Sequence, residues 1–126
     1  MIMIRINIKP LSINRAWIGR QIPTAEFKAY KRDLPKLLPK DLQLPPGDLV
    51  LLIKFYFSNK LSDYDNCLKF TQDIITKHYG TDDREIHMGL IGKEKVKKGE
   101  DGIAFEFLQH SPDMFDKCRE LIIKTD

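Results

Sequence analysis

Isoleucine recurs at every second position at the start of the chain, at Ile2, Ile4, Ile6 and Ile8. The positions between these isoleucines are mostly polar. Because successive side chains of a β-strand point to opposite faces, this alternation predicts a half-buried strand over Met1–Lys9. We expect Pro10 to end the strand, since proline lacks the backbone N–H that strand pairing uses.

Three further strands are predicted from apolar runs. Leu49–Ser58 is apolar almost throughout, which is typical of a central strand buried on both faces. Glu85–Val96 is interrupted by Gly89 and Gly92, so we expect a β-bulge in it. Residues 97–102 are interpreted as a hairpin turn that leads into a fourth strand, residues 103–108.

Apolar residues at helical spacing predict three helices. The first begins at Pro23–Thr24 and is expected to break or kink at Pro35. The second spans Asn66–His78, and Gly80 is placed to end it in the left-handed conformation. The third begins at Ser111–Pro112, with the serine as cap.

The order of elements is then β-α-β-α-β-β-α, with residues 11–22 as a loop before the first helix. This order predicts an α+β fold in which helices pack on a small mixed sheet. The length of 126 residues fits a single domain over residues 1–126.

The composition, 42% hydrophobic and 31% charged, is that of a soluble globular domain. The longest apolar run, Leu49–Ile53, is too short to span a bilayer, and no export leader is recognisable. Cys67 and Cys118 have no CxxC partner, which argues against a zinc site or a disulfide framework. We therefore expect reduced thiols, a cytoplasmic location and no membrane contact.

Charge is divided unevenly along the chain. Residues 1–40 hold nine Lys or Arg against two acids, a net charge of +7, whereas residues 41–126 hold twelve against sixteen, a net charge of −4. Basic surface beside an acidic centre is typical of proteins that hold a polyanion around a metal. A solvated surface of mixed charge is the plainer interpretation.

Residues 60–84 contain five aspartates: Asp63, Asp65, Asp73, Asp82 and Asp83. Carboxylates at close spacing repel one another, and such a cluster often binds a cation. Clustered aspartates without a paired histidine or cysteine suit Mg²⁺ or Mn²⁺ better than Zn²⁺. A metal bound there can polarise a phosphodiester and activate a water molecule.

Their positions along the chain separate these aspartates into a candidate metal site and a structural residue. Asp63 and Asp65 follow the second strand and Asp82–Asp83 follow the next helix, so we expect both pairs at one end of the sheet. Asp73 lies further along the helix and is expected to be structural. Lys69 either pairs with Asp73 or adds a positive charge for phosphate. The competing interpretation for all these residues is that they cap helices and turns.

The histidines carry less information. His78 lies on the apolar side of the predicted helix and is expected at the core or its boundary. His87 and His110 have no partner at a spacing typical of metal ligands. The sequence shows neither a Ser-His-Asp or Cys-His arrangement nor a glycine-rich phosphate loop.

One combined pattern of residues carries a family resemblance: Asp63-x-Asp65-Asn66-x-x-Lys69-x-x-x-Asp73, followed by Gly80 and Asp82–Asp83. This pattern resembles the signature of the RusA-type Holliday junction resolvases, which are small bacterial and phage endonucleases. The N-terminal Pro10-x-Ser12-x-Asn14-Arg15 is similar to the Pro-x-Ser-x-Asn opening of that family, and Tyr30 also fits. The resemblance covers most of the chain.

The resemblance implies a homodimeric endodeoxyribonuclease that uses Mg²⁺, with Mn²⁺ as a substitute, to cut two opposed strands of a four-way DNA junction. It assigns metal binding and catalysis to Asp63, Asp65 and Asp83, and transition-state stabilisation to Lys69. Asp82 takes a supporting role. A symmetric dimer can present one active site to each of two symmetric strands.

Side chains expected to contact the DNA, mostly at phosphates, are Asn14, Arg15, Arg20, Lys28, Lys31, Lys93 and Lys95. Three alternatives to a junction-resolving enzyme stay open. The chain can be a non-catalytic protein that binds branched DNA, a metal nuclease for another branched or flap DNA, or a small interaction domain that binds no DNA.

Overall fold

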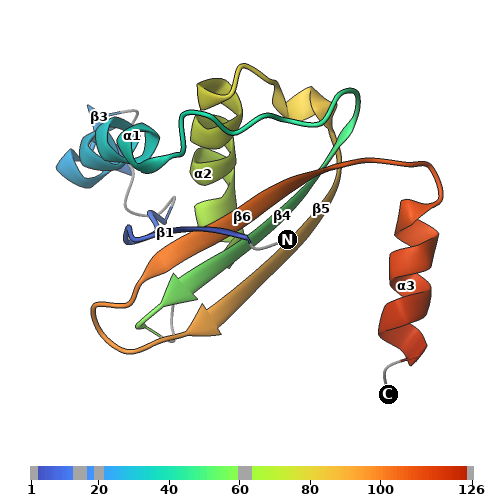
Figure 1. Cartoon of the computed structure of the whole chain (residues 1–126). Coiled ribbons are helices and arrows are strands. Elements are labelled where there is room, and N and C mark those ends of the chain that lie inside the picture. Colours follow the sequence, from blue (N-terminus) through green and yellow to red (C-terminus); the bar gives the residue numbers. More distant parts are fainter. Residues whose placement is uncertain (1–2, 13–16, 19–21, 60–63, 125–126) are drawn as a thin grey trace.

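The computed structural model describes residues 3–12, 17–18, 22–59 and 64–124, and for residues 17, 18 and 64–66 the backbone alone. The elements in chain order are β1 (Ile4–Ile6), β2 (Trp17–Ile18), β3 (Ile22–Pro23), α1 (Ala25–Leu37), β4 (Leu49–Phe57), α2 (Tyr64–His78), the 3-10 helix η2 (Asp83–Glu85), β5 (Ile86–Lys95), β6 (Gly102–Gln109) and α3 (Met114–Lys124) (Figure 1).

β4 lies inside a four-stranded sheet with the strand order β1-β6-β4-β5. It runs parallel to β5 and antiparallel to β6, and β1 is antiparallel to β6. The predicted α+β fold with a mixed sheet is therefore confirmed. The predicted central position of β4 is also confirmed, and Val50 and Leu51, on opposite faces of the strand, are 2% and 1% exposed.

The segment before α1 differs from its prediction. β2 and β3 pair as a small antiparallel ladder, in which Ile18 lies opposite Ile22, where a loop was expected. Each of these strands is only two residues long, which is too short for a period-two pattern to be visible in the sequence.

The connection from β5 to β6 is not the hairpin turn that the sequence predicted. β5 and β6 lie on opposite sides of β4, so residues 96–101 cross the end of β4. Val96 N–H donates to the carbonyl oxygen of Phe57 at 2.8 Å, and the Asp101 carboxylate accepts from Ser58 N–H at 3.1 Å. The glycine and lysine residues of this segment indicate a turn but not which strands it joins.

α1 and α2 cover one face of the sheet (Figure 1). Alternate residues of β4 on that face, Leu51, Ile53 and Phe55, are at most 2% exposed and belong to one hydrophobic core with residues of both helices. The two helices are joined inside the core by a hydrogen bond of 2.6 Å between the hydroxyl groups of Tyr30 and Thr71.

The ends of the helices follow from local chemistry. Thr24 caps α1, and its hydroxyl oxygen accepts from Phe27 N–H at 3.1 Å. Pro35, where a break or kink was expected, lies inside α1, and the helix ends two residues later at Leu37. Gly80 follows α2 with φ +72°, as predicted. His78 is exposed, not packed at the core.

β5 contains the predicted irregularity, but at another position. Leu49 pairs with Ile86 and Val50 pairs with Met88, so His87 is an extra residue at the start of β5. The glycines at 89 and 92 pair regularly with β4. The extra residue lets Ile86 and Ile91, which are five positions apart, both pack against the core.

α3 stands apart from the sheet and from the other two long helices (Figure 1). None of its residues is buried, and the apolar side chains of Phe115, Leu121, Ile122 and Ile123 are 52–65% exposed. Among the described residues, no helix combines the length and the hydropathy that crossing a bilayer requires.

Candidate functional site

Three of the four predicted catalytic residues lie on α2 or on the segment that follows it. Asp63 lies outside the described residues, and only the backbone of Asp65 is described, in the first turn of α2. Lys69 is exposed one turn further along the same helix. Asp83 is exposed and begins η2, beyond the C-terminal end of α2.

The sequence predicts Asp65 and Asp83 at the same end of the sheet, but in the structure they lie at opposite ends. β4 and β5 are parallel, so the segment that leaves β4 and the segment that enters β5 lie at opposite ends. Asp83 contacts Thr76, and Thr76 lies eleven positions after Asp65 on α2, a rise of roughly 16 Å along the helix. One ion therefore cannot bind Asp65 and Asp83 of the same chain.

Asp73, which the sequence predicts to be structural, is the aspartate that meets Asp83. Partial burial raises the pKa of the Asp73 carboxyl to about 6, and a hydrogen bond and charge repulsion from Asp83 add to the rise. The nearby charge of Lys69 acts in the opposite direction and lowers the pKa of Asp73. Two carboxyl groups in this arrangement are stabilised either by a shared proton or by a cation.

Thr76 and Asp82 hold the segment that carries Asp83. The hydroxyl of Thr76, a residue only 3% exposed, lies 3.1 Å from Asp83 Oδ1 and 2.9 Å from the carbonyl oxygen of Gln72. Asp82 caps η2, and its carboxylate accepts from Arg84 N–H at 2.9 Å. The cap interpretation therefore holds for Asp82, whose pKa is lowered by that backbone hydrogen bond.

The basic residues expected to contact DNA fall into separate groups. Lys28 and Lys31 are exposed on α1, and Lys93 and Lys95 are exposed on the last residues of β5. Lys93 and Lys95 pair with the C-terminal half of β4, so they lie at the end of the sheet opposite Asp83. The other predicted contacts, Asn14, Arg15 and Arg20, lie outside the described residues.

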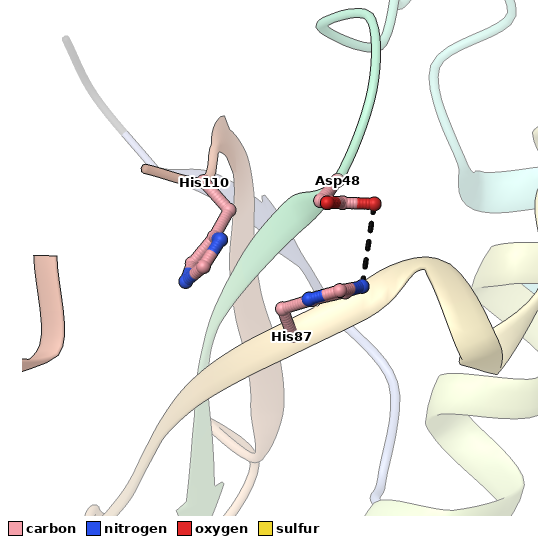
Figure 2. A group of neighbouring side chains, drawn as sticks. All are labelled: Asp48, His87 and His110. Atoms are coloured by element: carbon pink, nitrogen blue, oxygen red, sulfur yellow. Dashed lines mark ion pairs between the residues drawn. The ribbon is translucent and has the colours of Figure 1, made fainter. Parts of the chain in front are cut away.

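Sequence reasoning missed a second group of polar residues. Asp48, His87 and His110 come together at one end of the sheet, with potential ligand atoms within 4.8 Å of one another (Figure 2). The spacing of the two histidines in sequence does not indicate a site. Their positions at the ends of predicted strands would have indicated one, but only if the strand order had been known.

Comparisons of the chain with models of known protein families and with curated proteins find no match. The resemblance to the RusA-type resolvases therefore rests on the residues quoted for it.

Proposed function

We propose that this chain is a Mg²⁺-dependent, structure-specific endodeoxyribonuclease that resolves four-way DNA junctions by phosphodiester hydrolysis and accepts Mn²⁺ in place of Mg²⁺. It acts in the cytoplasm of a bacterium or of a phage-infected cell. The observation that carries the proposal is the Asp73–Asp83 carboxyl pair, with Thr76 against one carboxylate and Lys69 near the other.

The chemistry of the pair supports a hard cation. Two neighbouring carboxylates repel each other when both are ionised; partial burial first, and then the hydrogen bond and the charge of Asp83, raise the pKa of Asp73 to about 6. Mg²⁺ prefers oxygen ligands and usually keeps several waters or substrate phosphates beside one or two carboxylates. Asp73 and Asp83 would supply two ligands and leave the remaining positions for water and the scissile phosphate.

Lys69 fits the role that the resemblance implies for it. Its side chain is exposed, and it acts electrostatically on Asp73, one turn away on α2. An ammonium group beside the metal can stabilise the charge that develops on the phosphate or on the leaving oxygen.

The metal ligands proposed for this chain differ from those that the resemblance implies. The family pattern assigns catalysis to Asp63, Asp65 and Asp83, but within one chain Asp83 lies beside Asp73. We therefore place the metal of this chain on Asp73 and Asp83. Asp63→Asn and Asp65→Asn, made as separate variants, would measure what the other two acids of the family pattern contribute.

The exposed apolar side of α3 supports the proposal of a homodimer. Phe115 and Leu121 are 63% and 65% exposed on a helix that has no buried residue. A second copy that packs the same stripe against it would bury these side chains on both chains and make a two-fold assembly suited to a symmetric junction. Sedimentation should give a dimer that Leu121→Glu converts to a monomer.

The decisive experiment is cleavage of a labelled four-way junction in Mg²⁺. We expect Asp73→Asn, Asp83→Asn and Lys69→Ala each to lose activity while retaining junction binding, because binding rests on the basic residues. Asp82→Asn is the matched control: asparagine keeps an oxygen that can cap η2, only the ion pair with Arg84 is lost, and most activity should be retained. Cleavage by Asp73→Asn at the wild-type rate would refute the metal site proposed for this chain.

A non-catalytic protein that binds branched DNA is the second candidate. The separation of the Asp65 backbone from Asp83 favours it, because one ion cannot then bind both of these residues in the same chain. This candidate predicts tight junction binding without cleavage in either Mg²⁺ or Mn²⁺. Parallel assays with flap and linear duplex DNA at matched salt would distinguish a nuclease for another branched DNA.

A further inference from the structure

Asp48, His87 and His110 lie at the same end of three neighbouring strands. Asp48 directly precedes β4, His87 is the second residue of β5 and His110 directly follows β6. Because β4 is flanked by β5 and β6, these three positions are adjacent across the sheet although they are far apart in sequence. Figure 2 shows the Asp48 carboxylate above the ring of His87, with the ring of His110 beside them.

Backbone pairing fixes the three positions before any ligand binds. His110 N–H donates to the carbonyl oxygen of Asp48 at 2.8 Å, which extends the β4–β6 pairing by one residue beyond Leu49 and Gln109. On the other side of β4, His87 occupies the extra position of the bulge, a feature that commonly re-aims a side chain near functional sites. The three side chains are therefore held by strands, not by a mobile loop.

The side chains already approach one another. His87 Nε2 lies 3.2 Å from Asp48 Oδ1, and the rings of His87 and His110 are 5.3 Å apart between centroids. Ligands in a tetrahedral zinc site at about 2.0–2.1 Å from the metal are roughly 3.3 Å from one another. The Asp48–His87 pair has that separation, and the third ligand atom lies within 4.8 Å, so a modest side-chain rotation would complete the set.

We propose that Asp48, His87 and His110 form a binding site for a borderline divalent cation of the Zn²⁺ type. Two imidazoles and one carboxylate are typical ligands of Zn²⁺, whereas Mg²⁺ prefers oxygen ligands alone. Three protein ligands leave a fourth position for water. The residues are partly exposed, so a cation can reach the site from solvent.

A plain ion pair explains less of this arrangement. An exposed Asp–His contact contributes little to stability, because both partners are hydrated and screened by salt. It also gives no role to His110, whose backbone and ring are both held next to the pair. A bound cation uses all three side chains and ties β4, β5 and β6 together where the chain leaves the sheet toward α3. This site shares no residue with Asp73 and Asp83.

The test is thermal unfolding of the full chain with ZnCl₂ as the probe, after removal of metal by a chelator. We expect saturating zinc, at about a hundred times its dissociation constant, to raise the melting temperature by roughly 10 °C. In His87→Ala/His110→Ala this rise should be lost. Asp48→Asn should weaken zinc binding by at least about tenfold, since even the loss of a group that only hydrogen-bonds to a metal ligand commonly lowers metal affinity by that factor. MgCl₂ should not reproduce the rise.

Two controls keep the outcome unambiguous. His78→Ala removes an exposed histidine elsewhere, and Cys118→Ser removes a partly exposed thiol; both should bind zinc as the wild type does. The visible absorption of Co²⁺ bound in place of Zn²⁺ should be present in the wild type and absent from the double-histidine variant. No stabilisation of the wild type, or equal zinc binding by the double-histidine variant, would overturn the proposal.

Discussion

The hydroxyl of Thr76 lies 3.1 Å from Asp83 Oδ1, and this contact joins the C-terminal half of α2 to the segment that carries Asp83. Thr76 is 3% exposed, so a carboxylate that belongs to an exposed turn is anchored by a buried group. Asp83 is thereby held next to Asp73, on the preceding turn of the same helix.

The first prediction concerns this anchor. Thr76→Val keeps the size of the side chain but removes the hydroxyl, so Asp83 loses its contact with Thr76 and retains only the one with Asp73 on α2. We expect the free energy of unfolding in urea to fall by about 1 kcal/mol and the Mg²⁺ dissociation constant to rise several-fold. Thr76→Ser retains the hydroxyl and should keep the Mg²⁺ affinity. Unchanged Mg²⁺ binding in the valine variant would show that Asp83 needs no anchor.

The second prediction follows from the raised pKa of Asp73. Because the folded-state pKa is about 6 and the ordinary value is 3.8, the folded chain binds more protons than the unfolded chain between these values. Stability should therefore fall as pH rises from about 4 to 6, and ionised Asp73 stays unfavourable above that range.

Asp73→Asn removes this titration and is the variant to compare. Its melting temperature should exceed that of the wild type at pH 8, and the difference should shrink toward pH 4. Asp116→Asn, on the exposed surface of α3, should show no such trend. Addition of Mg²⁺ at pH 8 should stabilise the wild type and not Asp73→Asn. A pH-independent difference would contradict the assigned pKa.

The third prediction concerns Tyr30 and Thr71, whose hydroxyl groups form a buried hydrogen bond of 2.6 Å. Burial raises the pKa of Tyr30, so the phenol is neutral at any physiological pH. Tyr30→Phe leaves the Thr71 hydroxyl buried without this partner and should cost about 1–3 kcal/mol in urea unfolding.

A double-mutant cycle tests whether the two hydroxyls act as one unit. Thr71→Val and Tyr30→Phe together should cost less than the sum of the single changes, because the double variant leaves neither hydroxyl unpaired. Additive costs would show that the hydrogen bond contributes nothing. Junction binding should be unaffected in all three variants, since Tyr30 is only 4% exposed.

The fourth prediction concerns Gly102, at the start of β6. A Cβ at this position would come 2.6 Å from the carbonyl oxygen of Ile6 on β1, where backbone cannot yield easily. Gly102→Ala should therefore destabilise the fold by about 1–3 kcal/mol. Gly89→Ala is the matched control, because its Cβ would meet only ordinary contacts, the nearest at 3.8 Å. Equal stabilities of the two variants would contradict the close approach of β1 to β6.

Much of the fold is visible in the sequence because it depends on local patterns. The apolar run of β4, the helical spacing in α2 and the glycine after it predict elements within two residues of their observed bounds. What the patterns do not contain is strand pairing. The turn chemistry of residues 96–101 predicts a reversal, but the strand that lies between β5 and β6 is decided by long-range packing.

In the candidate site too, the residue types are predictable from the sequence, whereas their spatial arrangement is not. The cluster of aspartates and the nearby lysine were recognisable from residue types alone. Which aspartates meet depends on the parallel pairing of β4 and β5, which places the two ends of α2 at opposite ends of the sheet. Asp48, His87 and His110 escaped sequence reasoning for the same reason, since only the strand order makes them neighbours.

The position of β1 at the outer edge has a consequence for synthesis of the chain on the ribosome. Within the described part of the chain β1 pairs only with β6, and Ile4 lies opposite Phe105, about 100 residues later. At translation rates of about 5–20 residues per second, the isoleucine-rich first strand waits roughly 5–20 seconds for its partner. During that time it is an unpaired edge, open to chaperones and to other nascent chains. Slow translation, or truncation before β6, should therefore favour aggregation.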